Sequence, residues 1–410
     1  MAETSTLPLA GTRVVAIEQA VAAPLCSRHL ADLGAEVIKV ERTGSGDFAR
    51  DYDRFAKGMS SHFVWLNRGK RSVSVDLKTT AGQEILLTLL DTADVFLSNL
   101  GPGAVDRIVE DAELVRRNPR LVRCSISGYG PDGPYRMRKA FDLLVQGEAG
   151  VTANTGEPGN PAKPGVSLAD LGGGIYAATA ILAALRKRDV TGRGDRVDVA
   201  MFDVLVEWMS PLLIAYREAG IEVPPAGTRH ATITPYGPFV TADGATINIA
   251  VQNDRQWLAL CECLDARELG DDLGLLSNDD RLARRGHVEG SVTTAVARYP
   301  ESELLRRLDA AGVPWGRMNG IAEVAAHPQL EAGNRWITAS LPLDQQVQVA
   351  APPFRFASHP QVLGDGGRVP EVGQDTASVL TELGYPPNSL NDLLAQGAIQ
   401  MPVTVQGADR

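Results

Sequence analysis

The sequence has little that would place the chain in a membrane, outside the cell or on a nucleic acid. No run of about 18 apolar residues is present, so we expect no membrane span. Segment 1–11 lacks the basic and apolar stretches of a secretory signal. The net charge of −10 argues against nucleic acid or an anionic membrane surface as a partner. With 44% hydrophobic and 22% charged residues, the composition is typical of a soluble globular protein.

Cysteine is scarce and offers no framework. The four cysteines, Cys26, Cys124, Cys261 and Cys263, have the spacing of neither a disulfide scaffold nor a paired CxxC zinc site. We therefore expect packed thiols and a cytoplasmic protein. The six histidines show no metal-ligand spacing, so no metal centre is expected.

Several cofactor and nucleophile motifs are also missing. The turn after the first expected strand reads EQAVAAP rather than GxGxxG, and no P-loop GxxxxGK[ST] is present. Neither GxSxG nor HExxH occurs. The sequence thus weakens the hypothesis of an NAD-dependent dehydrogenase, and no permanently bound cofactor is expected.

What is present is an alternation of strands and helices. Short β-branched runs predict strands, and helical spacing predicts helices between them. The expected strands are 12–18, 35–41, 72–77, 94–99 and 120–128, and the expected helices are 23–34, 80–93 and 102–118. This order predicts an α/β fold whose large, Rossmann-like domain has a mostly parallel sheet.

A second domain follows a change in composition near residue 220. Segment 222–239 is rich in proline with little periodicity, which suggests a linker, and an Asp-Gly pair at 243–244 predicts a hairpin. A long apolar helix before it is expected to reach Ile214. We therefore divide the chain into a large domain of 1–220 with 340–410 and a smaller α+β domain of 221–339.

Asp170 is the carboxylate most suited to chemistry. It opens the strongest amphipathic helix, about 168–188, and three glycines, Gly172, Gly173 and Gly174, follow it. A carboxylate in a first helical turn is kept ionised by the helix dipole. The glycines would let a bulky ligand approach the backbone, although they equally permit close helix packing, and Asp is a common N-cap.

Ordered sequence blocks resemble the CaiB/BaiF family, the family III CoA-transferases. They are LPLAGTRVVAIEQAVAAPLCSRHLADLGAEVIKVERTGSGD, LNRGKRSVSVDLKTTAGQEILLTLLDTADVFLSNLGPGAVDRI, NPRLVRCSISGYGPDGPY, SLADLGGGIYAATAILAALRKRDVTGRGDRVDVAMFD and PYGPFVTADG. The resemblance covers nearly the whole chain and implies that Asp170 is the nucleophile. It would form an acyl anhydride and then an aspartyl-CoA thioester while moving CoA between carboxylic acids.

The resemblance also implies where CoA, as a substrate, is held. Its phosphates require basic side chains. The implied contacts are Val21, Ala22, Arg42, Lys70, Arg71, Asn99, Leu100, Arg107, Arg138 and Lys139. Gly237 in TPYGPF is a candidate oxyanion donor, although the chain lacks the long Gly-rich loop that some transferases carry near this position.

Two further functions stay open. An α-methylacyl-CoA racemase on the same fold needs two acid–base groups, but Phe141 stands before Asp142 where such enzymes carry His. Glu148 or His230 would have to replace it. A non-catalytic CoA-binding protein is the other alternative, and the retention of Asp170 argues against it.

The expected assembly is a homodimer of interlocked chains, as the resemblance implies and as the linker length allows. The expected partners are an acyl-CoA and a carboxylic acid, whose identities the sequence does not specify.

Overall fold

The computed structural model describes residues 7–357 and 366–402. The chain divides into two compact units. The first comprises Met1–Ala149, Gly165–Met209 and Gln329–Arg410, and the second Gly150–Pro164 and Ser210–Pro328. The sequence places its domain limits at 220/221 and 339/340 instead.

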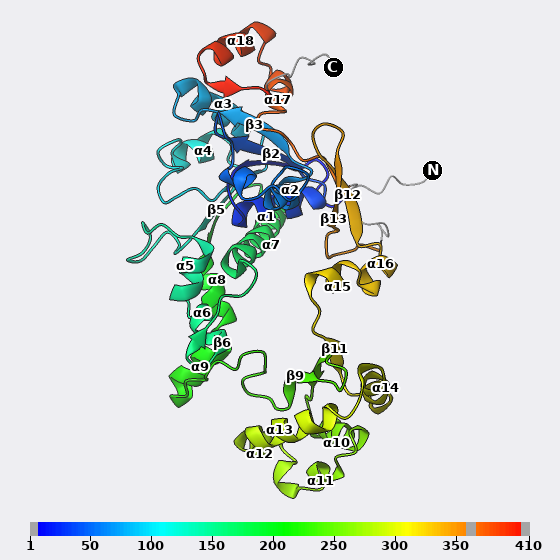
Figure 1. Cartoon of the computed structure of the whole chain (residues 1–410). Helices are drawn as coiled ribbons and strands as arrows, with labels where there is room; N and C mark the ends of the chain where they lie inside the picture. The colour runs from blue at the N-terminus through cyan, green and yellow to red at the C-terminus, as the bar shows by residue number, and fades with distance from the viewer. Residues whose placement is uncertain (1–6, 358–365, 403–410) are drawn as a thin grey trace. The chain divides into compact units, whose positions relative to one another are not determined.

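A seven-stranded sheet organises the first unit (Figure 1). Its strand order is β14-β3-β2-β1-β4-β5-β8, and every neighbouring pair is parallel except β14 with β3. The bounds are β1 Arg13–Ile17, β2 Glu36–Glu41, β3 Arg71–Val75, β4 Val95–Ser98, β5 Val122–Ser127, β8 Arg196–Ala200 and β14 Ile399–Gln400. The expected α/β fold with a mostly parallel sheet is confirmed.

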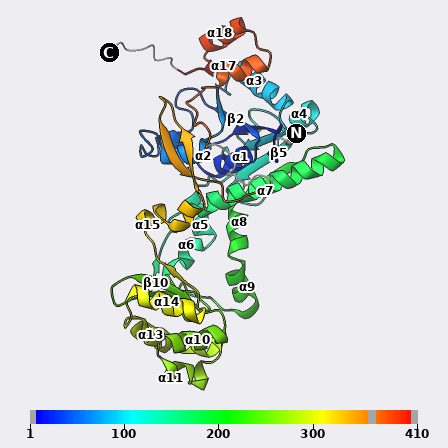
Figure 2. The ribbon, with the colours of Figure 1, turned by 90° about the vertical axis from the view of Figure 1, so that its right-hand side faces the viewer.

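Helices cover both faces of this sheet, as alternating side chains require. On one face Val15, Ile38 and Phe96 pack in a core with residues of three helices. These helices are α3 Thr80–Asp91, α17 Thr376–Glu382 and α18 Pro387–Ala395. The opposite face meets α1 Ala22–Asp32 and α7 Leu168–Thr191, which lie side by side in Figures 1 and 2.

Helix α7 is the longest helix in the described residues and carries Asp170 in its first turn. By length and composition alone it could cross a membrane, and 44% of its most apolar window is buried. It packs on α1, β5 and β8, and a core helix of a soluble protein meets the same criteria. The expectation of no membrane span therefore stays a prediction.

Shorter elements complete the first unit. They are η1 Phe48–Asp51, α2 Ser61–Asn67, α4 Asp111–Arg117, α5 Asp142–Glu148, α8 Met201–Trp208, β12 Trp336–Ser340 and β13 Gln346–Ala350. Helix α16 Pro328–Ala332 lies at the unit boundary.

Two expected helices were wrong in extent. The helix expected over 102–118 is helical only in α4, because Pro102 and Gly103 favour the turns that precede it. The helix expected to reach Ile214 ends at Trp208, and a new helix, α9 Ser210–Ala219, begins with Pro211 in its first turn.

The second unit has its own core around a three-stranded sheet, β11-β10-β9. The strands are β9 Tyr236–Val240, β10 Thr246–Ala250 and β11 Trp315–Arg317, and the expected hairpin corresponds to β9 and β10. The helices are α6 Val151–Asn154, α9, α10 Asp254–Cys263, α11 Arg267–Gly270, α12 Asn278–Ala283, α13 Arg285–Val296, α14 Glu301–Ala311 and α15 Ile321–Ala325. The turn η2 Leu273–Leu275 and the short strands β6 Gly156–Glu157 and β7 Asn160–Pro161 also belong to it.

Candidate active site

Asp170 lies in the first turn of α7 and is partly exposed. The helix is capped from outside by the nearly buried Asp142, whose Oδ1 accepts hydrogen bonds from the N–H groups of Ala169 at 2.9 Å and Asp170 at 3.4 Å. The dipole of α7 and the N–H groups of its first turn favour negative charge at this end of the helix, where the Asp170 carboxylate lies. Asp142 therefore fixes the backbone that carries Asp170, a role that its sequence neighbourhood does not reveal.

The glycines after Asp170 permit close packing. A Cβ atom on Gly172 would lie 2.6 Å from Val204 Cγ1, and one on Gly174 would lie 2.6 Å from the carbonyl oxygen of Ala22. The first turns of α7 thus press against α8 and the N-terminus of α1. This brings Ala22, a predicted CoA contact, close to the helix turn that begins with Asp170.

The turn between β1 and α1 lies at the point where the sheet order reverses. Strand β1 pairs with β2 on one side and with β4 on the other, which is where open α/β sheets bind ligands. Asn99, after β4, spans this point: its Oδ1 accepts from Gln19 N at 2.9 Å, and its Nδ2 donates to Gln19 O at 2.8 Å. The predicted contact Asn99 therefore holds the β1–α1 turn.

Tyr52 is a neighbour of the site that the sequence did not indicate. Burial first, and then the carboxylates of Asp47 and Asp170, raise the pKa of Tyr52 to about 12. Its ring lies 5.8 Å from that of Phe48 and 5.6 Å from that of His62. Tyr52 keeps its hydroxyl proton near Asp170, and no motif marks it in the sequence.

The predicted basic contacts differ in availability. Arg42, Arg107 and Lys139 are exposed, and Arg42 Nε donates to Gly46 O at 2.8 Å. Arg138 is also exposed but pairs with Glu148 at 2.8 Å. An exposed cation can turn toward a phosphate at little cost, since a surface ion pair is weak.

Arg71 and Lys70 are held by protein carboxylates. Arg71 pairs with Glu36 at 2.6 Å and with Glu382 at 2.7 Å. Lys70 is 2% exposed, and its Nζ lies 2.6 Å from Glu18 Oε1. The position of Lys70 beneath the β1–α1 turn leaves its ammonium group facing protein atoms rather than solvent.

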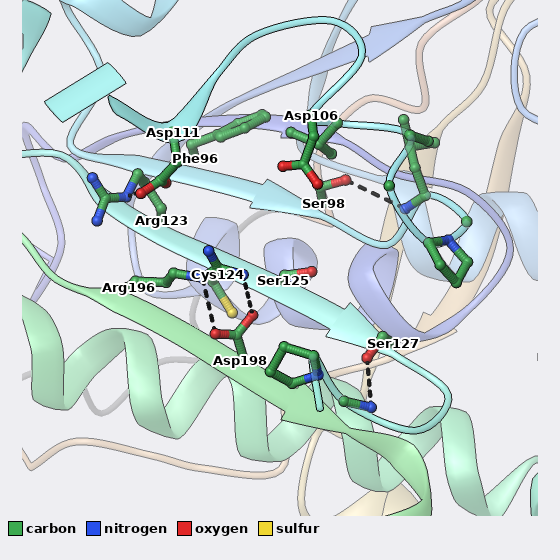
Figure 3. Close-up of a pocket in the computed structure, with 18 of the residues that line it drawn as sticks. Phe96, Ser98, Asp106, Asp111, Arg123, Cys124, Ser125, Ser127, Arg196 and Asp198 are labelled. Atoms are coloured by element: carbon green, nitrogen blue, oxygen red, sulfur yellow. Dashed lines mark hydrogen bonds and ion pairs between the residues drawn. The ribbon is translucent and has the colours of Figure 1, made fainter. Parts of the chain in front are cut away.

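A cavity of about 330 Å³ opens over β4, β5 and β8 (Figure 3). Ser98, Ser125 and Asp198 occupy facing positions on the three strands, and the predicted contact Leu100 borders the cavity. Its floor is the sheet face opposite α7, because Ile126, which alternates with Ser125, lies against α7 at Gly173.

Three arginines line this cavity: Arg123 and Arg196 are paired with aspartates, whereas Arg136 is exposed. Arg123 lies 3.1 Å from Asp111, and Arg196 lies 3.0 Å from Asp198. The strong Arg196–Asp198 hydrogen bond raises the pKa of Arg196. An anion that binds Arg123 or Arg196 would have to compete with these aspartates.

The remaining candidates lie in defined surroundings. His230 stacks on Tyr236 at 5.1 Å, and Gly237 pairs with Ile249 within the small sheet. Phe141 is 64% exposed and precedes α5. No group of three His, Cys, Asp or Glu residues in the described ranges could hold a metal ion.

The chain is similar to known proteins over most of its length. Residues 9–376 match the model of CoA-transferase family III. The chain is 31% identical to a succinyl-CoA:glutarate CoA-transferase of Homo sapiens over 403 residues. This alignment covers 97% of this chain and 91% of the relative. It is 34% identical to a succinate–glutarate CoA-transferase of Agrobacterium fabrum over 385 residues. That alignment covers 92% of this chain and 96% of the relative.

A solved structure supports the same assignment. A CAIB/BAIF family protein from Brucella suis matches with a TM-score of 0.80 and 33% identity, covering 92% of this chain and all of that one. The resemblance inferred from the sequence blocks is thereby confirmed, and so is an enzyme that transfers CoA. The chain therefore belongs to CoA-transferase family III.

Proposed function

We propose that the enzyme transfers CoA through covalent intermediates on Asp170. The observation that carries this proposal is a partly exposed carboxylate in the first turn of α7, beside the N-terminus of α1. Asp142 fixes the backbone around it. The dipole of α7 stabilises the ionised, nucleophilic form of a carboxylate in this position, so the proposal requires no separate general base.

The proposed reaction is balanced without proton transfer. Asp170 attacks the thioester carbonyl. This forms a mixed anhydride between Asp170 and the acyl group and expels CoA thiolate. The thiolate then attacks the aspartyl carbonyl, which releases the donor acid and leaves an aspartyl-CoA thioester. The acceptor carboxylate repeats both steps in reverse, and Asp170 is regenerated. Overall one CoA thioester is exchanged for another, and the covalent intermediates divide this exchange into easier steps.

For CoA we propose contacts with Val21, Ala22, Arg42, Asn99, Leu100, Arg107, Arg138 and Lys139. Exposure of the four basic side chains supports their part, because the CoA phosphates need mobile cations. Lys70 and Arg71 act behind this surface through the carboxylates that they bind.

The relatives suggest the substrates. The human relative is named for succinyl-CoA and glutarate, the Agrobacterium relative for succinate and glutarate, and a third, from Haloarcula hispanica, for succinyl-CoA and mesaconate. We propose succinyl-CoA as the donor and a small dicarboxylate as the acceptor. A screen of acyl-CoAs against carboxylic acids, with product masses as the readout, tests this choice.

We further propose a cytoplasmic homodimer with interlocked chains. Helix α9 supports the dimer. None of its residues is buried, and its apolar side chains Ile214 and Tyr216 are each 61% exposed. Apolar side chains on an exposed helix are typical of a protein interface.

Asp170→Ala tests the nucleophile. We expect turnover to fall by about four orders of magnitude or more, while CoA binding and the melting temperature stay close to wild type. Asp189→Ala, in an exposed position on the same helix, is the matched control and should keep full activity.

A second experiment traps the intermediate in the wild-type enzyme. After incubation with acyl-CoA and hydroxylamine or borohydride, mass spectrometry should show modification of Asp170. Normal turnover in Asp170→Ala would exclude the mechanism.

A further inference from the structure

Four buried charged side chains lie beneath the β1–α1 turn. Glu18, Lys39, Asp47 and Lys70 are 3%, 0%, 4% and 2% exposed. Lys70 Nζ lies 2.6 Å from Glu18 Oε1, and Lys39 Nζ lies 2.8 Å from Asp47 Oδ2 and 3.4 Å from Glu18 Oε1. We call these four residues the buried cluster. Because desolvation of charge is costly, two carboxylates and two ammonium groups are retained here only as pairs.

The pairing keeps the cluster charged. Burial alone would raise the pKa of Glu18, but Lys70 and Lys39 lower it below its ordinary value. Burial would lower the pKa of Lys39, but Glu18 and Asp47 raise it. Burial prevails at Lys70, whose pKa falls to about 8. Lys39 and Glu18 therefore remain ionised at neutral pH.

Asp47 connects this cluster to the turn. Its Oδ2 accepts from Lys39 Nζ, while its Oδ1 accepts from Ala20 N at 3.1 Å and from Ala49 N at 2.9 Å. The backbone of Asp47 is anchored in turn, because its N–H donates to Glu41 Oε2 at 2.9 Å. Asp47 is thus a rigid acceptor placed against one backbone N–H group of the turn.

That N–H group belongs to a residue in an unfavourable conformation. Ala20 has φ 60°, in the left-handed region that a residue with a Cβ atom adopts at a cost. Its conformation is held on one side by Asn99, which binds both backbone groups of Gln19, and on the other by Asp47. If either is lost, the turn can relax toward negative φ.

The conformation of Ala20 decides where the next two residues lie. Val21 and Ala22 follow directly, and the Ala22 carbonyl packs against Gly174, four residues beyond Asp170. We propose that Asp47, locked by Lys39, is a positioning residue that holds Ala20 left-handed and so orients the Val21–Ala22 backbone for CoA. This inference rests on the proposed contact of CoA with Val21 and Ala22.

Asp47→Ala is the first test, with Asp32→Ala as the matched control. Asp32 is also buried and ion-paired, with Arg28 at 2.7 Å and Arg68 at 2.6 Å, but it ends α1 and binds no atom of the turn. We expect both variants to lower the melting temperature. Only Asp47→Ala should weaken CoA binding in calorimetry, by about tenfold, and raise the KM for acyl-CoA with kcat nearly unchanged.

A rescue separates positioning from general stability. Gly adopts φ 60° without strain, so Ala20→Gly added to Asp47→Ala should recover most of the CoA affinity without recovering the melting temperature. Ala20→Gly alone should bind CoA nearly as well as wild type. Should Asp47→Ala fail to fold, Ala20→Val leaves the buried cluster intact but disfavours positive φ, and it should weaken CoA binding.

The outcomes distinguish this inference from the proposed function. Wild-type protein that does not bind CoA in calorimetry would refute the proposed CoA contacts themselves. Wild-type binding together with unchanged affinity in Asp47→Ala, or in Ala20→Val, would overturn the positioning role alone. Failure of Ala20→Gly to rescue a weakened Asp47→Ala would show that Asp47 acts through stability rather than through the turn.

Discussion

At the scale of single residues, Asp142 and Phe141 separate CoA transfer from racemisation. Both oxygens of Asp142 are engaged, Oδ1 by the start of α7 and Oδ2 by Gln146 Nε2 at 2.7 Å. Phe141 cannot carry a proton. Of the possible replacements, Glu148 pairs with Arg138, and His230 stacks on Tyr236. The surroundings of Asp170 therefore favour a nucleophile over one half of an acid–base pair.

The enzyme should accordingly exchange CoA but not α-hydrogen. In heavy water, a 2-methylacyl-CoA should gain no deuterium at its α-carbon, whereas CoA should pass to an added carboxylic acid. Mass spectrometry of the thioester measures both. Rapid deuterium uptake without any acceptor acid would mean that a second proton carrier reaches the site.

His29 should make the protein sensitive to acid. Burial first, and Arg28 second, lower its pKa from 6.5 to about 4. Between these values the unfolded state binds more protons than the folded state, so the free energy of unfolding decreases as the pH falls. Between pH 7 and pH 4.5, the free energy of unfolding of His29→Gln should therefore decrease by about 2 kcal/mol less than that of the wild type.

Urea unfolding at the two pH values measures the difference. His287→Gln, at an exposed histidine, serves as the control and should keep the wild-type pH dependence. An equal acid loss in wild type and His29→Gln would contradict the role of His29.

At the scale of elements, the contact of α7 with α1 depends on individual glycines. A Cβ on Gly174 would lie 2.6 Å from the backbone oxygen of Ala22. Because this oxygen belongs to the backbone, a side chain at residue 174 would force one of the two helices to move. A Cβ on Gly173 would come closest to the flexible side chain of Met201, at 3.1 Å, and would lie at an ordinary contact distance of 3.5 Å from Ile126 Cγ2. Gly174 therefore sets the distance between the two helices that border the site.

Gly174→Ala should cost about 2 kcal/mol of stability and lower activity, because the overpacked helix moves away from α1. Gly173→Ala should be close to neutral, since alanine favours the helix and Met201 can rearrange. Thermal unfolding and turnover of the two variants provide the comparison. Equal behaviour would show that the helix contact is softer than the distances indicate.

The sequence predicts these elements better than it predicts their surroundings. Strand and helix alternation is a local pattern, so β1, α1 and β2 were recognisable, as was Asp170 at a helix start. Lys70 was expected near CoA because the family resemblance implies that contact. Its burial depends on Glu18, which lies 52 residues away, and no local pattern contains that pairing. Tyr52 was missed for the same reason.

At the scale of the whole molecule, the proposed homodimer explains the apolar surface of α9. Light scattering at micromolar concentration should give twice the chain mass of 43.7 kDa. Because interlocked chains cannot separate while folded, a tagged and an untagged preparation should not exchange subunits after mixing. A monomeric mass would refute the dimer, and rapid exchange would refute the interlocking.

The antiparallel strand β14 has a consequence for synthesis on the ribosome. It covers the outer edge of β3, and Ser72 N donates to Asp375 Oδ2, 303 residues further along, at 2.9 Å. Until the ribosome has made that late segment, β3 is an open strand edge beside an incomplete core. The edge of β3 would thus stay open to edge-to-edge association until β14, which follows the last helices, has been made.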